Sequence, residues 1–336
     1  MFIATANRRD TIPGPLLDRM EVIDLPGYTR EEKQQIAKSF LVPRQLSDHG
    51  LTPERLEFTD EGIDKIVDEY TREAGVRRLE QQVAAICRAV AVRFAEGEDV
   101  HDVATPSLVE KVLGAGRHRR EGPERKASAG VATGVVWTPS GGDLLFVEAR
   151  RMPGTGKIQL TGQMGSIMKE SAAAAFTLVR TRAADLGLPE DFLTKIDVHI
   201  HLPAGAVPKD GASAGVTIFT AIVSMLTRLK AKPDIASTGE LTLRGNVLRV
   251  GGIKEKVLAA HRAGIRKVIL PERCEKDIRE IPDEIKAELT FHFCSRMEEV
   301  LEIALGKENI ETAREALELE LAARRNAKAA GGEAQA

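Results

Sequence analysis

The chain has 336 residues, 43% of them hydrophobic and 29% charged, and its 48 basic and 50 acidic residues leave a net charge of −2. This length predicts about two domains of about 150 residues each, and the balanced charge gives no overall attraction to nucleic acid. No apolar run reaches the about 18 residues of a membrane span, and the start lacks a secretory signal, so the sequence favours a cytoplasmic protein without a membrane partner.

The first 25 residues read as fragments of a sheet. An apolar run over 2–6 predicts a strand, 15–20 a short helix, and 22–25 a second strand. Because a domain that opens in mid-sheet is unusual, we expect this segment to be the tail of a larger unit.

From Thr29 to about Ala115 the pattern predicts a small all-helical domain. Thr29 and Glu32 have the spacing of a capping box, and Thr59 opens another helix. A third helix is expected from Val76 to about Phe94. The apolar residues that mark the faces of the second and third helices are Ile63, Ile66, Val67, Leu79, Val83, Ile86, Val90 and Val92.

Residues 117–130 are charged, then small and punctuated by Pro and Gly, which predicts a linker. Its basic cluster, residues 117–120, could contact an anion, but a solvated linker is the favoured interpretation.

Beyond Val131 short β-rich runs alternate with helical patterns, which predicts a mixed α/β (α+β) domain. Strands are expected at 135–137, 143–148, 157–161 and 197–202, helices at about 166–186, 214–230, 253–263 and 297–305, and a hairpin turning at Gly245-Asn246. The charged, Ala-rich tail over 307–336 is expected to be disordered.

One serine stands out, Ser213 in Pro208-Lys209-Asp210-Gly211-Ala212-Ser213-Ala214-Gly215. Small neighbours let a substrate backbone approach, and the apolar helix that follows puts the serine at a helix N-terminus, where N–H groups favour an oxyanion. The alternative is that Ser213 only caps that helix.

A serine nucleophile needs a base, and the candidates are Lys209, Lys254 and Lys256. A lysine acts as a base only if burial lowers its pKa. Lys256 lies within an apolar stripe at helical spacing, whereas Lys254 points to another face. The members of the stripe are Ile253, Val257, Ala260 and Gly264. The pattern favours Lys256 modestly.

Other patterns suggest different chemistries. Residues 211–215 fit the G-x-S-x-G elbow of α/β-hydrolases, with Asp277 and His292 as partners, but Pro208 breaks the strand that an elbow requires. Ser166-Ile167-Met168-Lys169 matches S-x-x-K without its companion motifs and is better explained as a helix start.

Two patterns suggest a phosphate or a metal ion. Gly154-Thr155-Gly156-Lys157 lacks the first Gly and the final Ser/Thr of a phosphate loop. His199 and His201 share a strand face without a third ligand, so a structural or site-lining role is favoured. The three scattered cysteines, Cys87, Cys274 and Cys294, suggest buried thiols, and no metal site is expected.

These motifs together resemble the Lon family of ATP-dependent serine proteases over about residues 1–306. The residues that carry the resemblance are 208–215, Ser237-Thr238-Gly239-Glu240-Leu241-Thr242-Leu243-Arg244-Gly245 and GGIKEKVLAAHRAGI over 251–265. The resemblance implies a Ser-Lys dyad of Ser213 and Lys256, with Thr238 supporting the lysine. It also assigns Asp210, Glu148, Gly211 and Ala212 to the surroundings of the site, Ala212 standing where the family usually has Pro.

The N-terminal part resembles the AAA+ module of that family. Asn7 corresponds to sensor 1, Arg19 to the arginine finger and Arg77 to sensor 2, so 1–25 is expected to end the nucleotide-binding core and 26–116 to be its helical lid. The protease domain is expected over 131–306. No Walker A motif occurs and no Walker B strand precedes Met1, so the chain alone should not hydrolyse ATP.

The resemblance implies a serine endopeptidase that degrades unfolded or damaged proteins. Peptide hydrolysis itself should need no cofactor, whereas the full-length enzyme would use ATP with Mg and assemble as a homohexameric ring. Nucleic acid is a partner for some members of the family, but this sequence does not indicate it. Two alternatives remain at this point, a non-catalytic scaffold for ring assembly and a small-molecule esterase of the α/β-hydrolase type.

Overall fold

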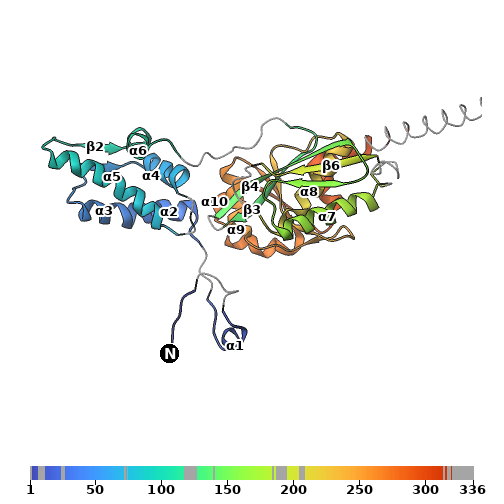
Figure 1. Ribbon diagram of the computed structural model, residues 1–336, viewed down its shortest axis with the longest axis horizontal. Coiled ribbons are helices and arrows are strands. Elements are labelled where there is room, and N and C mark those ends of the chain that lie inside the picture. The colour runs from blue at the N-terminus through green and yellow to red at the C-terminus, as the bar shows by residue number, and fades with distance from the viewer. Residues whose placement is uncertain are drawn as a thin grey trace, which may run out of the picture. The chain divides into compact units, whose positions relative to one another are not determined.

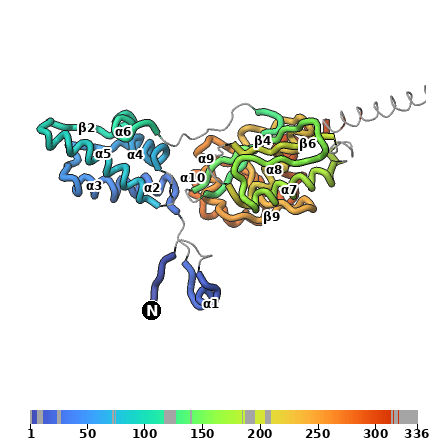
Figure 2. Tube along the Cα trace, viewed as in Figure 1, coloured from blue at the N-terminus to red at the C-terminus, as the bar shows by residue number. Residues whose placement is uncertain are grey.

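The computed structural model describes residues 2–6, 12–23, 27–71, 73, 75–116, 127–138, 141–183, 185–186, 195–203, 209–312, 315 and 319. The chain divides into two compact units, Met1–Gly116 and Arg117–Ala336. Figures 1 and 2 trace the course of the chain through each of them.

Helices form most of the first unit, as expected. They are α1 (Gly14–Leu17), α2 (Arg30–Ile36), α3 (Val42–Asp48), α4 (Asp60–Lys65), α5 (Arg77–Ala95) and α6 (Pro106–Leu113), with π-helical turns η1 (Ala37–Leu41) and η2 (Ile66–Tyr70). Two short strands, β1 (Leu56–Phe58) and β2 (Asp102–Ala104), pair in parallel beside them. Strands of three residues are too short to give a pattern in the sequence, and they were not predicted.

The helix starts follow the predicted caps. Thr29 Oγ1 accepts a hydrogen bond from Glu32 N over 3.2 Å, while Thr29 N donates to Glu32 Oε2 over 2.7 Å, which completes the capping box. Thr59 Oγ1 accepts from Gly62 N over 3.0 Å. The predicted apolar faces are buried, except that Val92 is 56% exposed because it lies on the outer side of α5.

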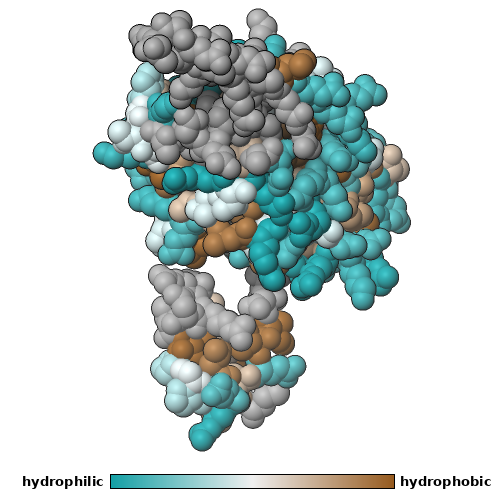
Figure 3. All heavy atoms as spheres, turned by 90° about the vertical axis from the view of Figure 1, so that its right-hand side faces the viewer, coloured by the Kyte–Doolittle hydropathy of each residue, from teal (hydrophilic) through white to brown (hydrophobic). Residues whose placement is uncertain are grey.

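The strand predicted over 2–6 is not formed. These residues adopt no regular structure and are exposed, since a strand needs a partner and no strand within the described ranges pairs with this segment. Val22 and Ile23 are likewise irregular, whereas the rest of that predicted strand lies outside the described residues. Exposed apolar side chains occur along this N-terminal segment, among them Phe2, Ile3, Leu16, Val22 and Ile23, and Figure 3 shows hydrophobic residues gathered in the lower part of the view.

A seven-stranded mixed sheet forms the centre of the second unit. Its strands are β3 (Val131–Thr138), β4 (Gly141–Pro153), β5 (Ile158–Thr161), β6 (Ile196–His201), β7 (Ile235–Ser237), β10 (Lys267–Pro271) and β11 (Thr290–Cys294), in the order β11-β10-β7-β3-β4-β6-β5. The pairs β3–β4 and β4–β6 are antiparallel, and the other neighbours run parallel. The mixed α/β prediction is therefore confirmed.

Helices cover both faces of this sheet (Figure 1). They are α7 (Ser166–Thr181), α8 (Gly215–Thr227), α9 (Ile253–Arg262), α10 (Asp283–Glu288) and α11 (Met297–Leu301), with the 3₁₀ turns η4 (Ala212–Ala214) and η5 (Glu272–Glu280) and the π-helical turn η6 (Glu302–Gly306). The buried side chains of α7, α8 and α11 join one core, and those of α9 join another with Val135 and Cys274.

The sequence did not predict β7, β10 and β11. They are short, and β7 and β10 are central, parallel and buried along almost their whole length. Their sequences therefore lack the alternation of apolar and polar residues that would distinguish a strand from a buried helix. The predicted hairpin is present as β8 (Glu240–Leu241) and β9 (Val247–Leu248), with Gly245 at φ 82° in its turn.

The predicted linker, 117–130, lies mostly outside the described residues, as does most of the tail, although residues 307–312 continue as helix after η6. Among the helices that the structure describes, none is both long and apolar enough to cross a membrane.

Candidate active site

Ser213 lies in η4, two residues before Gly215, the first residue of α8. The residue is half-buried. Its carbonyl oxygen accepts hydrogen bonds from Gly239 N over 2.9 Å and from Thr238 Oγ1 over 3.3 Å. Because Thr238 and Gly239 directly follow β7, these bonds attach the serine turn to the end of a central strand.

The preceding residue, Ala212, is held from the other side. Its carbonyl oxygen accepts from Gly215 N, within the 3₁₀ turn, and from the hydroxyl of Ser171 in α7 over 3.2 Å. A Cβ atom at Gly215 would lie 2.6 Å from Ser171 Oγ. Glycine is therefore required at the start of α8 for α7 to approach this closely.

Asp210 joins the same segment to the start of α7. Its Oδ1 accepts from Met168 N and from Gly211 N, each over 2.9 Å. A carboxylate that accepts a backbone N–H in the first turn of a helix acts as an N-cap and complements the helix dipole. Gly211 has φ 131°, a conformation that favours glycine.

Lys256 is on the first turns of α9 and is only 2% exposed, whereas Lys254 is half-exposed. The neighbours predicted to share its stripe, Ile253, Val257 and Ala260, are buried. Burial lowers the pKa of Lys256 from 10.5 to about 8, opposed by weaker effects of Cys274 and Glu255. Of the three candidate lysines, Lys256 therefore has the burial that a base requires.

The start of α9 is fixed by packing and by two polar contacts. Gly252, at φ 67°, leaves room for Trp137, whose nearest atoms would lie 3.0–3.2 Å from a Cβ there. Just upstream, Cys274 Sγ donates to the Val250 carbonyl over 3.5 Å, and the Arg249 guanidinium binds Asp277 over 2.8 Å. These contacts attach the segment before Lys256 to η5.

Among the described residues, no hydrogen bond joins the Ser213 hydroxyl to the Lys256 amine, nor does one join Thr238 to Lys256. The Thr238 hydroxyl binds the serine backbone instead. Hydrogen bonds between catalytic groups are often long without a substrate and tighten when one binds. The dyad of Ser213 and Lys256 therefore stays a prediction. Glu148 is half-buried on β4, paired in register with His201 and Val131.

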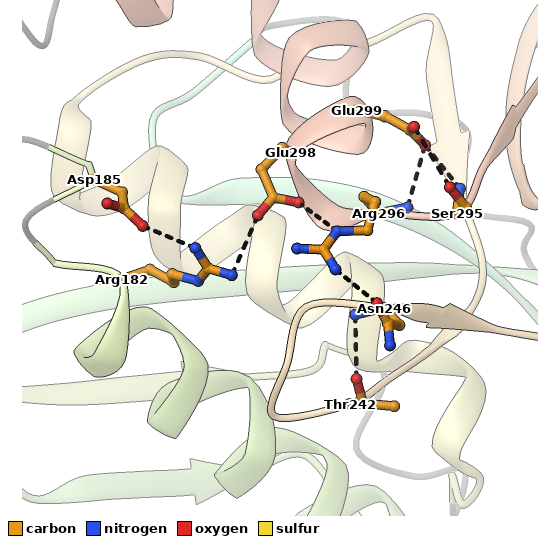
Figure 4. A network of polar contacts seen from close by, with 8 residues as sticks. All are labelled: Arg182, Asp185, Thr242, Asn246, Ser295, Arg296, Glu298 and Glu299. Atoms are coloured by element: carbon orange, nitrogen blue, oxygen red, sulfur yellow. Dashed lines mark hydrogen bonds and ion pairs between the residues drawn. The ribbon is translucent and has the colours of Figure 1, made fainter.

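A network of polar contacts supports the hairpin that follows Thr238 (Figure 4). Arg296 donates to Asn246 Oδ1 over 2.8 Å, and Asn246 N donates to Thr242 Oγ1 over 3.1 Å. Glu298 forms ion pairs with two arginines: its Oε2 lies 3.4 Å from Arg296 Nε, and its Oε1 lies 3.7 Å from Arg182 Nη2. The hairpin is thereby attached to α11 and to the residue after the end of α7.

The alternative hydrolase partners are engaged elsewhere. Asp277 forms the ion pair with Arg249, and His292 is on β11, beside Ile269 of β10. No hydrogen bond among the described residues links either of them to Ser213. Pro208, which argued against the elbow, lies outside the described residues.

The remaining motifs have structural explanations. The amides of Thr155 and Lys157 both donate to Asp197 over 2.8 Å, so a side chain of the same chain occupies the position where a phosphate loop would bind its ligand. His199 and His201 both bind Thr161 Oγ1, over 2.8 and 2.7 Å. In the described part of the chain, no group of three or more His, Cys, Asp or Glu side chains is placed to hold a metal ion.

The predicted nucleotide-sensing residues are only partly described. Asn7 lies outside the described residues, Arg19 is exposed just after α1, and Arg77 is the exposed first residue of α5. The carboxylate of Glu73 already binds the amides of Arg78 and Leu79 at that helix start, over 2.9 and 2.8 Å. Two of the amides at the N-terminus of α5 therefore already have an acceptor within the chain.

Sequence reasoning missed Ser171. The only available signal was the series of small residues over 171–175, because small side chains on one helix predict a close approach by another helix. It could not say which hydroxyl would contact the Ser213 segment, because residues 171 and 212 lie far apart in the chain.

Comparison with known proteins covers both units. A profile described as "Lon protease (S16) C-terminal proteolytic domain" matches residues 103–307, and one described as "Lon protease AAA+ ATPase lid domain" matches residues 47–103. Relatives include Lon protease 2 of Sorangium cellulosum and Lon protease 2 of Myxococcus xanthus, each 56% identical over 305 residues. Lon protease of Dictyoglomus thermophilum is 55% identical over 306 residues. Each alignment covers 91% of this chain but only 37–39% of the relative.

Proposed function

The chain belongs to the Lon protease family, and from this we propose that it carries the peptide-cleaving site of a serine endopeptidase, with Ser213 as nucleophile and Lys256 as general base. The proposal rests on the matches to the proteolytic domain and the lid domain, and on the chemistry of the two side chains.

The observation that carries the proposal is the burial of Lys256. A serine hydroxyl attacks a peptide only when a base removes its proton. With a pKa of about 8, roughly a tenth of the lysine amine is neutral at pH 7 and about half of it at pH 8. Lysine at its ordinary pKa of 10.5 would be almost entirely protonated and unable to act as a base.

In the proposed reaction, the neutral amine of Lys256 takes the proton of Ser213 Oγ as this oxygen attacks the scissile carbonyl carbon. Backbone N–H groups at the start of α8 stabilise the negative charge on the carbonyl oxygen. The resulting ammonium of Lys256 returns its proton to the departing amine, leaving an ester on Ser213. A water molecule, deprotonated by Lys256, then hydrolyses that ester and regenerates the serine.

The supporting residues have proposed roles of their own. Thr238 and Asp210 fix the backbone on either side of Ser213, through the Ser213 carbonyl and through α7 respectively. The small residues Gly211 and Ala212 leave room for a substrate backbone to approach the serine, and Glu148 borders the site. In this arrangement Thr238 acts on the site through its hydrogen bond to the Ser213 carbonyl oxygen.

Replacing Ser213 with Ala tests the proposal. The full chain should cleave unfolded casein, and Ser213→Ala should lose that cleavage while keeping the circular dichroism spectrum of the wild type. Ser224→Ala, which removes a buried hydroxyl from the far end of α8, is the matched control and should retain cleavage. Casein cleavage that persists in Ser213→Ala contradicts the assignment.

Activities of the longer protein are part of the same proposal. The chain spans less than two fifths of its relatives, so ATP dependence with Mg, a homohexameric ring, selection of unfolded substrates and a cytoplasmic location are proposed for the longer protein. There Arg19 would reach a neighbouring subunit's nucleotide, and Asn7 and Arg77 would sense it. Next to Arg77, the Glu73 carboxylate accepts hydrogen bonds from the amides of Arg78 and Leu79 at the start of α5.

A further inference from the structure

The hydroxyl of Ser171 reaches the peptide bond that joins Ala212 to Ser213. Ser171 is 8% exposed and donates to the Ala212 carbonyl oxygen over 3.2 Å. None of the reaction steps above requires this contact. It is nevertheless one residue from the nucleophile, and it comes from a different helix.

Because a peptide bond is planar, the contact at the Ala212 carbonyl also orients the N–H group on the other side of the same peptide bond. In a trans peptide the C=O of one residue and the N–H of the next point in opposite directions, and no described peptide bond is cis. Holding the Ala212 oxygen toward α7 therefore turns the Ser213 N–H away from α7. Within the described part of the chain, that N–H donates no hydrogen bond.

The helix that supplies the hydroxyl is well placed to act as a rigid support. α7 has 16 residues and buries Met168, Ala172 and Ala175 in the core. Its first turn is tied to the serine segment a second time, by the bond from Met168 N to Asp210 Oδ1. The close approach at Gly215 leaves the hydroxyl little freedom to move.

The adjoining peptide bond is fixed in the same manner from the other side. The Ser213 carbonyl accepts from Thr238 Oγ1 and Gly239 N, which sets the orientation of the peptide between Ser213 and Ala214. Two side-chain hydroxyls, one from α7 and one from the end of β7, thus fix consecutive peptide units at the nucleophile.

We propose that Ser171 is a positioning residue for the oxyanion site: by binding the Ala212 carbonyl, it aims the Ser213 N–H at the oxygen of the scissile carbonyl. This inference rests on the proposed function of Ser213. A preorganised N–H contributes most to the transition state, because it need not reorient as charge develops.

The test compares Ser171→Ala with the wild type in the full chain. Losing one oxyanion donor costs about a hundredfold to a thousandfold in kcat, and a donor that is present but loosely oriented should cost less, about tenfold to a hundredfold. KM should stay within about twofold, because the substrate ground state does not use this N–H fully. Affinity for a peptide boronate, which becomes tetrahedral on serine, should fall in step with kcat/KM.

Three further measurements separate positioning from a general loss of stability. The pH midpoint of kcat should not move, because Lys256 is untouched. Ser171→Cys, which keeps a weaker donor, should lie between wild type and Ser171→Ala. The control, Ser224→Ala, also removes a buried hydroxyl that donates to a carbonyl, here that of Leu229. It should lower stability without changing boronate affinity.

Two results would overturn the inference in distinguishable ways. If Ser213→Ala still cleaves casein, the proposed function fails and this inference fails with it. If Ser213→Ala is inactive but Ser171→Ala keeps wild-type kcat and boronate affinity, only the positioning role is wrong.

Discussion

Replacing Lys256 with Met should abolish peptide cleavage and, at the same time, stabilise the fold. Methionine has a similar length and no charge, so it fills the buried site without the cost of desolvating an ammonium group. The same burial that makes Lys256 a useful base therefore makes it a cost to stability.

The pKa of Lys256 gives the size of that cost. Its fall from 10.5 to about 8 corresponds to about 3 kcal/mol at about 1.4 kcal/mol per pKa unit. Below pH 8 the lysine is protonated in both states, and the folded protein bears the whole cost. Between pH 8 and 10.5 the unfolded chain binds more protons than the folded one, so the free energy of unfolding rises with pH. Above pH 10.5 the cost vanishes.

Urea unfolding measures this effect through the fluorescence of Trp137, the single tryptophan, which is on β3 of the protease unit. Lys256→Met should raise the free energy of unfolding at pH 7 by up to about 3 kcal/mol, and the gain should shrink as pH approaches 10.5. Lys254→Met, on the half-exposed side of the same helix, should show no such gain. A gain for Lys256→Met that does not depend on pH, or residual cleavage by that variant, would refute the reasoning.

Other substitutions test the surroundings of the site. Wild-type kcat should rise about tenfold per pH unit below pH 8 and level off above it, and a flat kcat profile between pH 6 and 9 would remove Lys256 as the base. Thr238→Val should lower kcat at least about tenfold with little change in KM, because the Ser213 carbonyl loses a hydrogen-bond donor. Steady-state peptide hydrolysis measures both constants, and an unchanged kcat would contradict this role of Thr238. Gly252→Ala should cost about 1–2 kcal/mol in urea unfolding, because its φ of 67° and the contact with Trp137 both exclude a Cβ. Asp210→Ala should lose about 1 kcal/mol through the cap of α7, and an unchanged unfolding midpoint would contradict that role.

Local patterns predicted the elements that carry the site, though not their mutual contacts. The stripe of Ile253, Val257 and Ala260 predicted the buried face of α9 and favoured Lys256 over Lys254, because helical periodicity depends only on neighbours three and four residues away. The helix start after Ser213 was predicted for the same reason.

Contacts between segments far apart in the chain could not be predicted from the sequence. The bond from Ser171 to Ala212 joins residues 41 positions apart, and its partners are fixed by how α7 packs on the sheet, which no local pattern encodes. The strand β10 was missed because a short apolar run fits a buried helix as well as a strand until its parallel neighbours are known. The segment over 2–6 shows the converse, since an apolar run of strand type forms no strand without a partner.

The most direct test of the central claim is the site of covalent labelling by a fluorophosphonate probe, read by peptide mapping with mass spectrometry. An adduct is expected on Ser213 of the wild-type chain, formed at a rate that rises with pH and levels off above about pH 8 as Lys256 becomes neutral. No adduct is expected at that position in Lys256→Met. Casein cleavage by a wild-type chain whose Ser213 remains unlabelled would contradict that claim, as would equally fast labelling of Ser213 in Lys256→Met.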